Sequence, residues 1–550
     1  MKSILHLALT ALALSTATAS AQSSAPVDLR ILAINDFHGY LRASPGIRIS
    51  DPADKEKKVL VPAGGSEHMA TLLKQLREGH HNNIFVTAGD LIGASPFLSA
   101  MFHDEPTIES LSMMGLDISS VGNHEFDEGK DELLRMQNGG CHPIDQCQGP
   151  HPFTGAKFHY LAASTIVKDT GKTLLPPYEI KTFDGIPVAF IGLTLKGTSI
   201  IISPASSAGL EFRDEAETVN ALVPELKAKG IEAIVVLIHE GGVPSGDYNE
   251  CPGISGPIVD IVKKLNKAVD IVISGHTHHA YVCNIDGRLV TSADKYGTLV
   301  TAIDVKLDPA THDVIRASAD NVIVRASIPA DPAQTALLES YDKVAAPVAD
   351  RRAGSVTATL SHVPNFTGES VLGDVIADAQ LAATSSEKDG RAVIAVTNPG
   401  GIRTDITGKN DGTVSYAELF ASQPFRNQLV TLNLTGAQIK AALEQQWRDP
   451  NLTRILQVSE GFSYAWDASR PFGAHVDAAS LKLNGTPIDP EKTYRVTTNN
   501  YLALGGDGFA AFKDGTNVQF GVYDVDALFS YFQAHSPVSV APPVRITRTN

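Results

Sequence analysis

Metal-binding side chains stand at the ends of five short apolar segments of this sequence. Each segment is a run of β-branched and other apolar residues of the kind that forms a buried parallel strand, and open α/β layers place their chemistry at the carboxyl ends of such strands. The side chains are Asp36 and His38 after RILAIN, Asp90 after IFVTAG, Asn123, His124 and Asp127 after ISSVG, His239 after IVVLI, and His276 and His278 after IVISG, while a sixth run, VAFIGLT, ends without one. The pattern predicts a catalytic metal centre.

The recurrence of these ligand types matters more than any one position. A single His after an apolar strand is more often a core or loop residue, and a strand-terminal Asp is often the N-cap of the next helix. Imidazole together with carboxylate suits zinc, manganese, iron or cobalt, whereas oxygen ligands alone would indicate magnesium or calcium. We therefore expect two divalent metal ions per chain, drawn from the first group.

Five blocks, D-F-H, G-D, G-N-H-E, H-E and G-H-T-H, occur in this order, and at these blocks the chain resembles the calcineurin-like metallophosphoesterases. The resemblance implies two metal sites that share one carboxylate: Asp36, His38 and His278 for the first metal, Asn123, His239 and His276 for the second, and Asp90 as the bridge. It also implies that His124 stabilises developing charge beside the substrate while Asp127 orients its imidazole. Family members with nucleotidase activity often carry Gln or Asn where His278 stands, so the chain departs from the pattern there.

A pair of metal ions suits the hydrolysis of a phosphate ester. Two cations about 3.5–4 Å apart clamp the attacking and leaving oxygens of an in-line displacement and lower the pKa of a bound water, so that hydroxide is available near neutral pH. A protonated His124 would add electrostatic stabilisation. A metal-ligating His usually donates its other ring nitrogen to a carboxylate or carbonyl, for which Glu125, Glu240 and main-chain oxygens are the candidates.

Length and composition are those of a globular protein with more than one domain. The chain has 550 residues, of which 43% are hydrophobic and 19% charged, and single cores stop growing well below this length. The formal net charge of −16 argues against nucleic-acid polymers as partners, since these require a basic surface. A small anionic nucleotide remains compatible with this charge, because metals and a few arginines can focus a positive field in a cleft.

The first 21 residues have the features of a secretory signal peptide. Lys2 precedes an apolar stretch from Ile4 to Leu14, and Ala19-Ser20-Ala21 offers a small-residue cleavage site. The alternative is a buried N-terminal helix. Because no later apolar run approaches 18 residues, we expect no membrane span and a periplasmic or secreted protein.

The four cysteines fit an oxidising compartment. Cys141 and Cys147 flank a short Pro-containing loop, and Cys251 and Cys283 lie on either side of the strand that carries His276. We predict the disulfides Cys141–Cys147 and Cys251–Cys283. The alternative, thiolates on a metal, is disfavoured because the spacings are not those of zinc sites.

The second half of the chain shows a new pattern. Strand-like stretches at 301–307 and 320–326 precede residues 331–349, where apolar side chains recur at helical spacing. We expect this helix to join two domains; a surface helix of the first domain is the alternative. The expected elements after it are helices at 372–383, 416–421 and 436–447 and strands at 392–398 and 428–434. We predict a signal peptide at 1–21, a metallophosphoesterase domain at 27–328, a linking helix at 331–350 and a substrate-binding domain at 352–548.

Three segments of this half, N-P-G-G-I-R, Q-P-F-R-N and N-N-Y-L-A-L-G-G-D-G-F, resemble the C-terminal domain of the 5'-nucleotidases. The resemblance implies that Asn398 and Arg403 bind the phosphate, that Phe425 and Tyr501 sandwich the base, and that Asp507 holds the ribose. An Arg fork matches phosphate oxygens, and aromatic faces stack on any base. Read singly, Phe425 could equally be a core residue, and Gly505 to Gly508 only a tight loop.

One family feature is missing from this half. Gly368 and Asp374 occupy the positions where the family usually has another phosphate-binding Arg. Arg426 lies next to Phe425 in the sequence, and we hypothesise that it takes over this role.

The expected protein is a member of the bacterial periplasmic 5'-nucleotidase and UDP-sugar hydrolase family. Its expected fold is α/β: an N-terminal four-layer β-sandwich flanked by helices, a linking helix, and a C-terminal α/β substrate-binding domain. The expected reaction releases phosphate from nucleoside 5'-monophosphates by attack of metal-activated hydroxide. Alternatives are a 2',3'-cyclic-nucleotide phosphodiesterase/3'-nucleotidase, a UDP-sugar hydrolase, an enzyme acting on sulfur esters, which would not need the two rings, and a non-catalytic nucleotide-binding surface protein.

Overall fold

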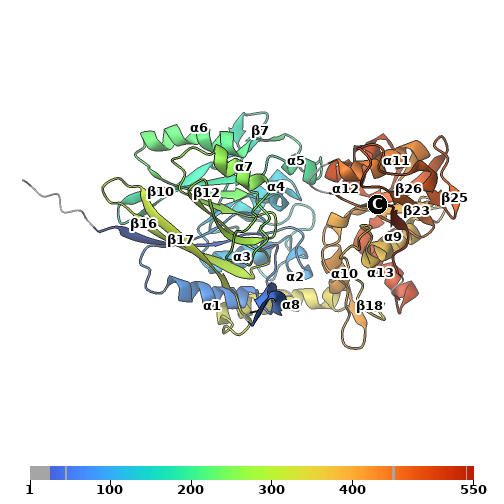
Figure 1. Cartoon of the computed structure of the whole chain (residues 1–550). Helices are drawn as coiled ribbons and strands as arrows, with labels where there is room; N and C mark the ends of the chain where they lie inside the picture. Colours follow the sequence, from blue (N-terminus) through green and yellow to red (C-terminus); the bar gives the residue numbers. More distant parts are fainter. Residues whose placement is uncertain (1–24, 44–45, 52, 449–452, 540–541) are drawn as a thin grey trace, which may run out of the picture.

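The computed structural model describes residues 25–43, 46–51, 53–448, 453–539 and 542–550. The predicted signal peptide therefore lies outside the described residues. Figure 1 shows two lobes, one built from the first three fifths of the chain and one from the remainder. In the described part of the chain, none of the helices is both long enough and apolar enough to cross a bilayer.

Two six-stranded sheets form the centre of the first lobe. The first has the order β17-β16-β1-β4-β5-β6 and the second the order β14-β15-β13-β12-β10-β9. The first comprises β1 (Val27–Ile34), β4 (Asn83–Thr87), β5 (Ile118–Ser120), β6 (His159–Leu161), β16 (Leu299–Leu307) and β17 (Val314–Ile323); the second comprises β9 (Tyr178–Phe183), β10 (Ile186–Thr194), β12 (Ala233–His239), β13 (Ile271–Ser274), β14 (Ala280–Ile285) and β15 (Arg288–Ala293). β1, β4 and β5 run parallel to one another, as do β10, β12 and β13, so the ends of the predicted ligand-bearing strands point the same way within each sheet.

The sheets pack face to face and carry helices on their outer faces, which confirms the predicted four layers (Figure 1). Ile31 and Ile84 of the first sheet share a buried core with Phe190 and Val235 of the second. The outer face of the first sheet is covered by α1 (Ser66–Arg77), α3 (Glu105–Met113) and α4 (Lys130–Asn138), and that of the second by α6 (Glu215–Ala228) and α7 (Pro257–Lys264). Because the central strands are buried on both faces, they are continuously apolar.

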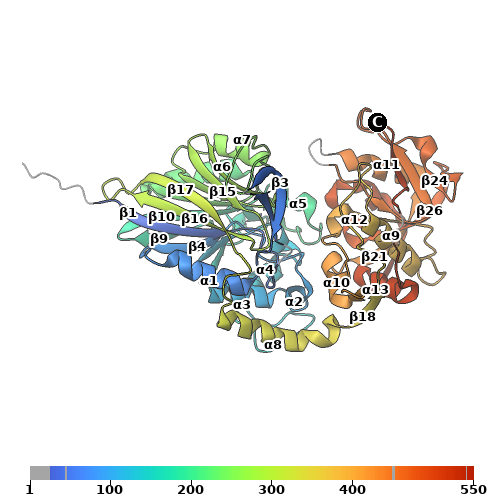
Figure 2. The same cartoon turned by 60° about the horizontal axis from the view of Figure 1, so that its bottom comes forward.

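Helix α8 (Pro332–Ala349) joins the lobes (Figure 2). The side chain of Asp331 caps it by accepting hydrogen bonds from the first backbone N–H groups of the helix. Leu338 packs in the core under α1 and α3, whereas Tyr341 packs in a cluster that contains Phe102 of the first lobe and Leu360 of the second. The helix is therefore shared by both lobes and is not a surface helix of the first one.

The second lobe is built around a five-stranded sheet with the order β22-β19-β26-β21-β27. Its strands are β19 (Ile394–Thr397), β21 (Gln428–Thr435), β22 (Gln457–Val458), β26 (Thr493–Asn499) and β27 (Thr516–Tyr523), and its helices include α9 (Val371–Thr384), α10 (Tyr416–Ser422), α11 (Gly436–Glu444) and α13 (Asp524–His535). A smaller sheet, β25-β24-β23-β28, contains β23 (Phe462–Trp466), β24 (Lys482–Leu483), β25 (Thr486–Pro487) and β28 (Ile546–Arg548). The elements predicted in this half are present within a few residues of their expected ends.

One strand prediction is displaced. The sequence predicts a strand at 320–326, but β17 spans Val314–Ile323 and pairs antiparallel with β16. The early part of β17 is an edge strand with side chains in water, so it lacks the apolar run that marks a buried strand. Both predicted disulfides, Cys141–Cys147 and Cys251–Cys283, are present. The exact domain limits, 27–328, 331–350 and 352–548, stay predictions.

Candidate active site

The sharp turns after the ligand-bearing strands give the site its shape. Five predicted ligands, Asp36, His38, Asp90, His276 and His278, have positive φ angles between 48° and 69°. A non-glycine residue in this left-handed region costs on the order of 1–3 kcal/mol, and such residues concentrate at functional sites. The strain turns side chains from different strands toward one point.

The first predicted metal group comes together after β1 and β13. Nε2 of His38 lies 3.1 Å from Nε2 of His278, and Nε2 of His278 lies 3.3 Å from Oδ1 of Asp36. The three residues offer ligand atoms that all lie within 4.8 Å of one another. His278 thus takes its place in the group, although related nucleotidases often have an amide there.

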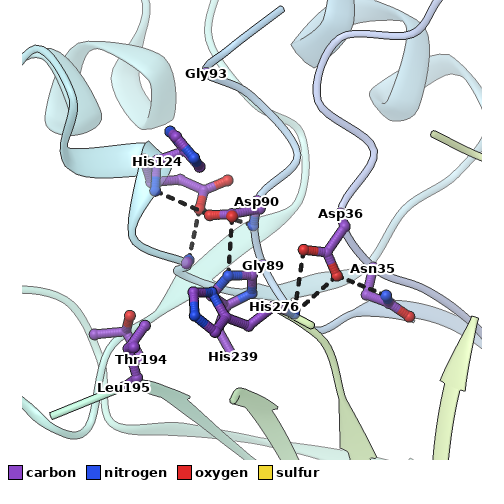
Figure 3. Close-up of polar contacts among 12 residues, drawn as sticks. Asn35, Asp36, Gly89, Asp90, Gly93, His124, Thr194, Leu195, His239 and His276 are labelled. Atoms are coloured by element: carbon purple, nitrogen blue, oxygen red, sulfur yellow. Dashed lines mark hydrogen bonds and ion pairs between the residues drawn. The ribbon is translucent and has the colours of Figure 1, made fainter. Parts of the chain in front are cut away.

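The second group surrounds Asp90 (Figure 3). Asp90, His239 and His276 also offer ligand atoms within 4.8 Å of one another. Oδ2 of Asp90 lies 2.9 Å from Nε2 of His239 and 3.7 Å from Nε2 of His38, so this carboxylate faces both groups, as a bridge must. A Cβ at Gly122 would lie 2.1 Å from Oδ1 of Asp90, which explains the glycine that precedes Asn123.

Two buried polar atoms of the second predicted group fit a metal ion. Nε2 of His239 and Oδ1 of Asn123 are buried without a hydrogen-bond partner; the short contact of His239 with Asp90 lacks hydrogen-bond geometry. Leaving a buried polar atom unpaired costs on the order of 1–3 kcal/mol. Both atoms belong to the second predicted group, so a single cation there would satisfy both. The imidazole and carboxylate donors suit a divalent transition metal.

Main-chain oxygens hold two of the imidazoles. Nδ1 of His38 lies 2.9 Å from the carbonyl oxygen of Gly93, and Nδ1 of His239 lies 2.8 Å from that of Ala88. These contacts place the ring proton on Nδ1 and leave Nε2 free to bind a cation. The sequence left Glu125, Glu240 and main-chain oxygens as candidate partners for the ligand imidazoles. At His38 and His239 the partner is a main-chain oxygen.

Two supporting residues have roles that the sequence did not predict: Glu125, which was considered only as a partner for a ligand imidazole, and Asn35. Glu125 accepts hydrogen bonds from the backbone N–H groups of Asp90, Leu91 and Gly122, which ties the turn after β4 to the turn after β5. Burial and the neighbouring charge of Asp90 raise the pKa of Glu125 to about 7. Asn35 similarly donates 2.6 Å to Oδ2 of Asp36. The only sequence signal of Asn35 was its adjacency to the predicted ligand Asp36.

His124 and Asp127 form the predicted pair. Nδ1 of His124 lies 2.7 Å from Oδ2 of Asp127, and the backbone N–H of His124 donates to Oδ1 of Asp90 at 2.9 Å. Burial alone would lower the pKa of His124, but the carboxylates of Asp127 and Asp90 outweigh it and the pKa lies above its ordinary value. Because Nδ1 is held by Asp127, Nε2 is the ring atom that would donate to a substrate oxygen.

Two predicted substrate residues of the second lobe lie beside this pair. The ring of Phe425 stacks on that of His124, with centroids 5.8 Å apart and an interplanar angle of 21°. The guanidinium carbon of Arg403 lies 6.0 Å from the Phe425 centroid. Burial is the main reason that the pKa of His38 is well below its ordinary value, and the charge of Arg403 contributes to that lowering, which places Arg403 near the metal groups.

The other three substrate residues form a hydrogen-bonded cluster. Asn398 donates to Oδ2 of Asp507 at 3.0 Å and accepts from Asn499 at 3.0 Å. The hydroxyl of Tyr501 lies 2.9 Å from Oδ1 of Asp507 and 3.0 Å from the carbonyl oxygen of Ile201 in the first lobe; its single proton serves one of them at a time. Among the described residues no ring contact links Phe425 with Tyr501, so the two-ring base site stays a prediction.

Gly368 and Asp374, which stand where the family usually has another phosphate-binding Arg, have structural roles in this chain. A Cβ at Gly368 would lie 2.4 Å from Ile455, and Oδ2 of Asp374 lies 3.8 Å from Nε of Arg545. Arg426, its hypothesised replacement, has NH1 3.9 Å from Oδ2 of Asp145 and lies over the ring of Tyr523. Both partners lie outside the predicted metal groups, and a role of Arg426 at the phosphate stays a prediction.

We expect Arg426→Ala to change kcat/KM for a nucleotide substrate by no more than about fivefold, because an exposed ion pair contributes at most about 1 kcal/mol. Arg403→Ala, measured beside it, is the matched comparison and should lose far more. Equal losses in the two variants would restore Arg426 as a phosphate ligand. The measurement is steady-state phosphate release.

Comparisons with known proteins agree with this architecture. Residues 29–280 match the family model of calcineurin-like phosphoesterases, and residues 349–514 match that of the 5'-nucleotidase C-terminal domain. The 5'-nucleotidase precursor from Thermus thermophilus superposes with a TM-score of 0.76 at 26% identity, covering 95% of this chain and 99% of that one.

Two relatives are more similar in sequence. The endonuclease YhcR of Bacillus subtilis is 32% identical over 94% of this chain and 41% of its own length. The cell wall protein Lmo0130 of Listeria monocytogenes is 31% identical over 94% of this chain and 68% of its own length. The chain thus spans about two fifths of the length of YhcR and about two thirds of the length of Lmo0130.

The four-layer sandwich and its Asp, Asn and His groups define a metallophosphoesterase. With the second lobe, the chain belongs to the 5'-nucleotidase family, in which a calcineurin-like phosphoesterase domain precedes a 5'-nucleotidase C-terminal domain.

Proposed function

We propose that this chain is an exported hydrolase that removes phosphate from nucleoside 5'-monophosphates with the help of two divalent metal ions. Asp36, His38 and His278 would hold one ion, Asn123, His239 and His276 the other, and Asp90 both. When bound, the ions supply charge neutralisation at the phosphoryl oxygens and an activated water. The assignment of each ligand rests on the convergence of these side chains.

The residues of the chain itself divide the remaining work. Asp127 fixes the His124 ring through Nδ1, so that Nε2 can donate a hydrogen bond to an oxygen of the transferring phosphoryl group. Arg403 supplies a planar fork of donors for phosphate oxygens. Tyr501 and Phe425 offer ring faces to the base, and Asp507 can accept hydrogen bonds from the ribose hydroxyls.

A single observation carries the proposal: the second lobe brings Arg403 and Phe425 to His124 beside the metal groups of the first. A phosphatase of small esters would not need a second lobe with aromatic rings at this place. The net charge of −16 favours a mononucleotide over a nucleic-acid polymer. Export rests on the signal-peptide pattern of residues 1–21 and can be checked by sequencing the N-terminus of the mature protein.

The proposal can be tested by measuring phosphate release from four substrates: AMP, 3'-AMP, 2',3'-cyclic AMP and UDP-glucose. Each substrate is assayed with and without Mn²⁺ or Zn²⁺. We expect metal-dependent release that is fastest from AMP. Faster turnover of the cyclic ester or of UDP-glucose would instead assign the chain to one of these related activities. Inactivity on all four with metal bound would refute the substrate assignment of the second lobe.

Phe425→Ala tests base stacking separately. Loss of one stacked ring costs on the order of 1–3 kcal/mol, so kcat/KM for AMP should fall roughly 5- to 150-fold. Ribose 5-phosphate, which has no base, should be hydrolysed by the variant as well as by the parent. Phe366→Ala, which removes an exposed ring elsewhere in the second lobe, is the control. An equal loss on both substrates would mean that Phe425 acts on the phosphate end and not on the base.

A further inference from the structure

We propose that His103, Glu128 and His142 form a third cation site, separate from the catalytic groups, which binds a divalent transition metal such as Zn²⁺. Together with Glu132, these residues offer ligand atoms that all lie within 4.8 Å of one another. They come from three segments: the turn between α2 (Phe97–Ala100) and α3, the stretch between His124 and α4, and the loop 141–147 that the Cys141–Cys147 disulfide closes. None of them belongs to the predicted catalytic ligands.

The spacing of the three ligand atoms is that of a metal site. Oε2 of Glu128 lies 3.1 Å from Nδ1 of His103 and 3.5 Å from Nε2 of His142. Ligands at 2.0–2.1 Å from a tetrahedral zinc ion are roughly 3.3 Å apart. The catalytic groups of the same chain have comparable separations, such as 3.3 Å between His278 and Asp36 and 2.9 Å between His239 and Asp90.

The two histidines of the site are shielded, and the half-exposed Glu128 beside them carries negative charge. The side chains of His103 and His142 are only 8% and 10% exposed, and their rings stack with centroids 3.8 Å apart. The carboxylate of Glu132 is neutralised by Arg135, whose Nε donates to it at 2.8 Å, so we do not count Glu132 as a ligand. Glu128 supplies the negative charge that a cation at the two imidazoles would meet.

Asp145 supports the two histidines from the other side. Its Oδ2 lies 2.9 Å from Nε2 of His103, an arrangement that leaves Nδ1 as the binding atom and resembles the carboxylate–histidine–metal chains of known sites. Its backbone N–H donates to Nδ1 of His142 at 3.1 Å. Binding through Nε2 of His142 moves the ring proton to Nδ1, so this backbone bond is released and the loop 141–147 adjusts when the cation binds.

The position of the site indicates a structural role. The cation would fasten the loop 141–147 to the turn that carries His103. The same loop faces the second lobe through Asp145, which lies 3.9 Å from NH1 of Arg426. The metal would thus stabilise the part of the first lobe that borders the second, without touching the reacting phosphate.

Bound metal in the full-length protein tests the proposal. The parent, the double variant His103→Ala/His142→Ala and a control, His159→Ala, are loaded with Zn²⁺, dialysed and analysed by elemental mass spectrometry. His159 is an exposed histidine outside the cluster. We expect the double variant to hold about one Zn²⁺ fewer per chain than the parent and the control. Because the result is a difference between variants, it does not depend on how many ions the catalytic groups hold.

A second variant and a second readout protect the test against misfolding. Glu128→Gln keeps the volume of the side chain and removes its charge, and it should also lower the Zn²⁺ content. Added Zn²⁺ should raise the thermal midpoint of chelator-treated parent more than that of Glu128→Gln, while both keep the parent's activity at saturating Mn²⁺. Equal Zn²⁺ content and equal thermal shifts in the parent and the variants would overturn the proposal and leave a hydrogen-bonded histidine–carboxylate network.

Discussion

Asp90→Asn should abolish turnover. The substitution keeps the shape of the side chain but removes the one carboxylate that faces both metal groups, with Oδ2 2.9 Å from Nε2 of His239 and 3.7 Å from Nε2 of His38. A neutral amide cannot neutralise two cations, so their spacing and occupancy are both lost. Because the ions carry most of the charge stabilisation, we expect kcat to fall by at least about 10³-fold, measured as phosphate release at saturating Mn²⁺.

The metal content separates this cause from a general loss of structure. Asp90→Asn should retain fewer bound ions than the parent after dialysis, while its circular dichroism is unchanged. Asp270→Asn is a matched control. Asp270 is half-buried, and the pKa of its carboxyl is raised to about 7 by burial. It precedes β13 at the end of the sheet away from the ligands, where it accepts from the N–H of Ile234. Full activity and full metal content in Asp90→Asn would contradict the bridging role.

The predicted metal ligands have a local signal in the sequence. Each ligand follows a buried strand, and the carboxyl ends of parallel strands meet at one edge of a sheet. The meeting of Asp36 and His38 from the first sheet with His278 from the second also depends on how the two sheets pack. The residues that hold the ligands carry no such signal. Gly93 and Ala88 act through their carbonyl oxygens, which every residue possesses, and Glu125 acts on the backbone of the turn after β4, more than 30 residues earlier in the chain.

In the second lobe, too, local features could be predicted from the sequence and long-range contacts could not. Helix α11 begins with a capping box in which Thr435 and Gln438 satisfy each other's backbone N–H groups, and such a start can be recognised in the sequence. The parallel pairing of β23 with β28 joins segments about 80 residues apart, and no periodicity within either strand specifies it. The role of Arg426 was inferred only from its sequence neighbour Phe425. Arg426 has a positive φ of 50°, and it contacts Asp145 and Tyr523. Phe425 instead stacks on His124, so neighbours in the sequence need not share a partner.

Replacement of His124 should slow the chemical step while substrate binding is largely preserved. His124 is not part of either predicted metal triad, and its ring is held by Asp127 with Nε2 directed away from that carboxylate. Removal of one preorganised donor to a developing charge typically costs about 10²–10³-fold in kcat. We therefore expect His124→Ala to lose kcat by that factor and to retain the parent's metal content.

Asp127→Asn resolves how the ring acts. An amide in place of the carboxylate still contacts Nδ1 of His124 but no longer stabilises its positive charge, so kcat should fall by a smaller factor, about 10–100-fold. The double variant His124→Ala/Asp127→Asn should then be no slower than His124→Ala alone, because Asp127 acts only through the ring. Multiplied losses in the double variant would show an independent role for Asp127. A changed KM with unchanged kcat in His124→Ala would instead assign the ring to ground-state binding, together with Phe425, which stacks on it.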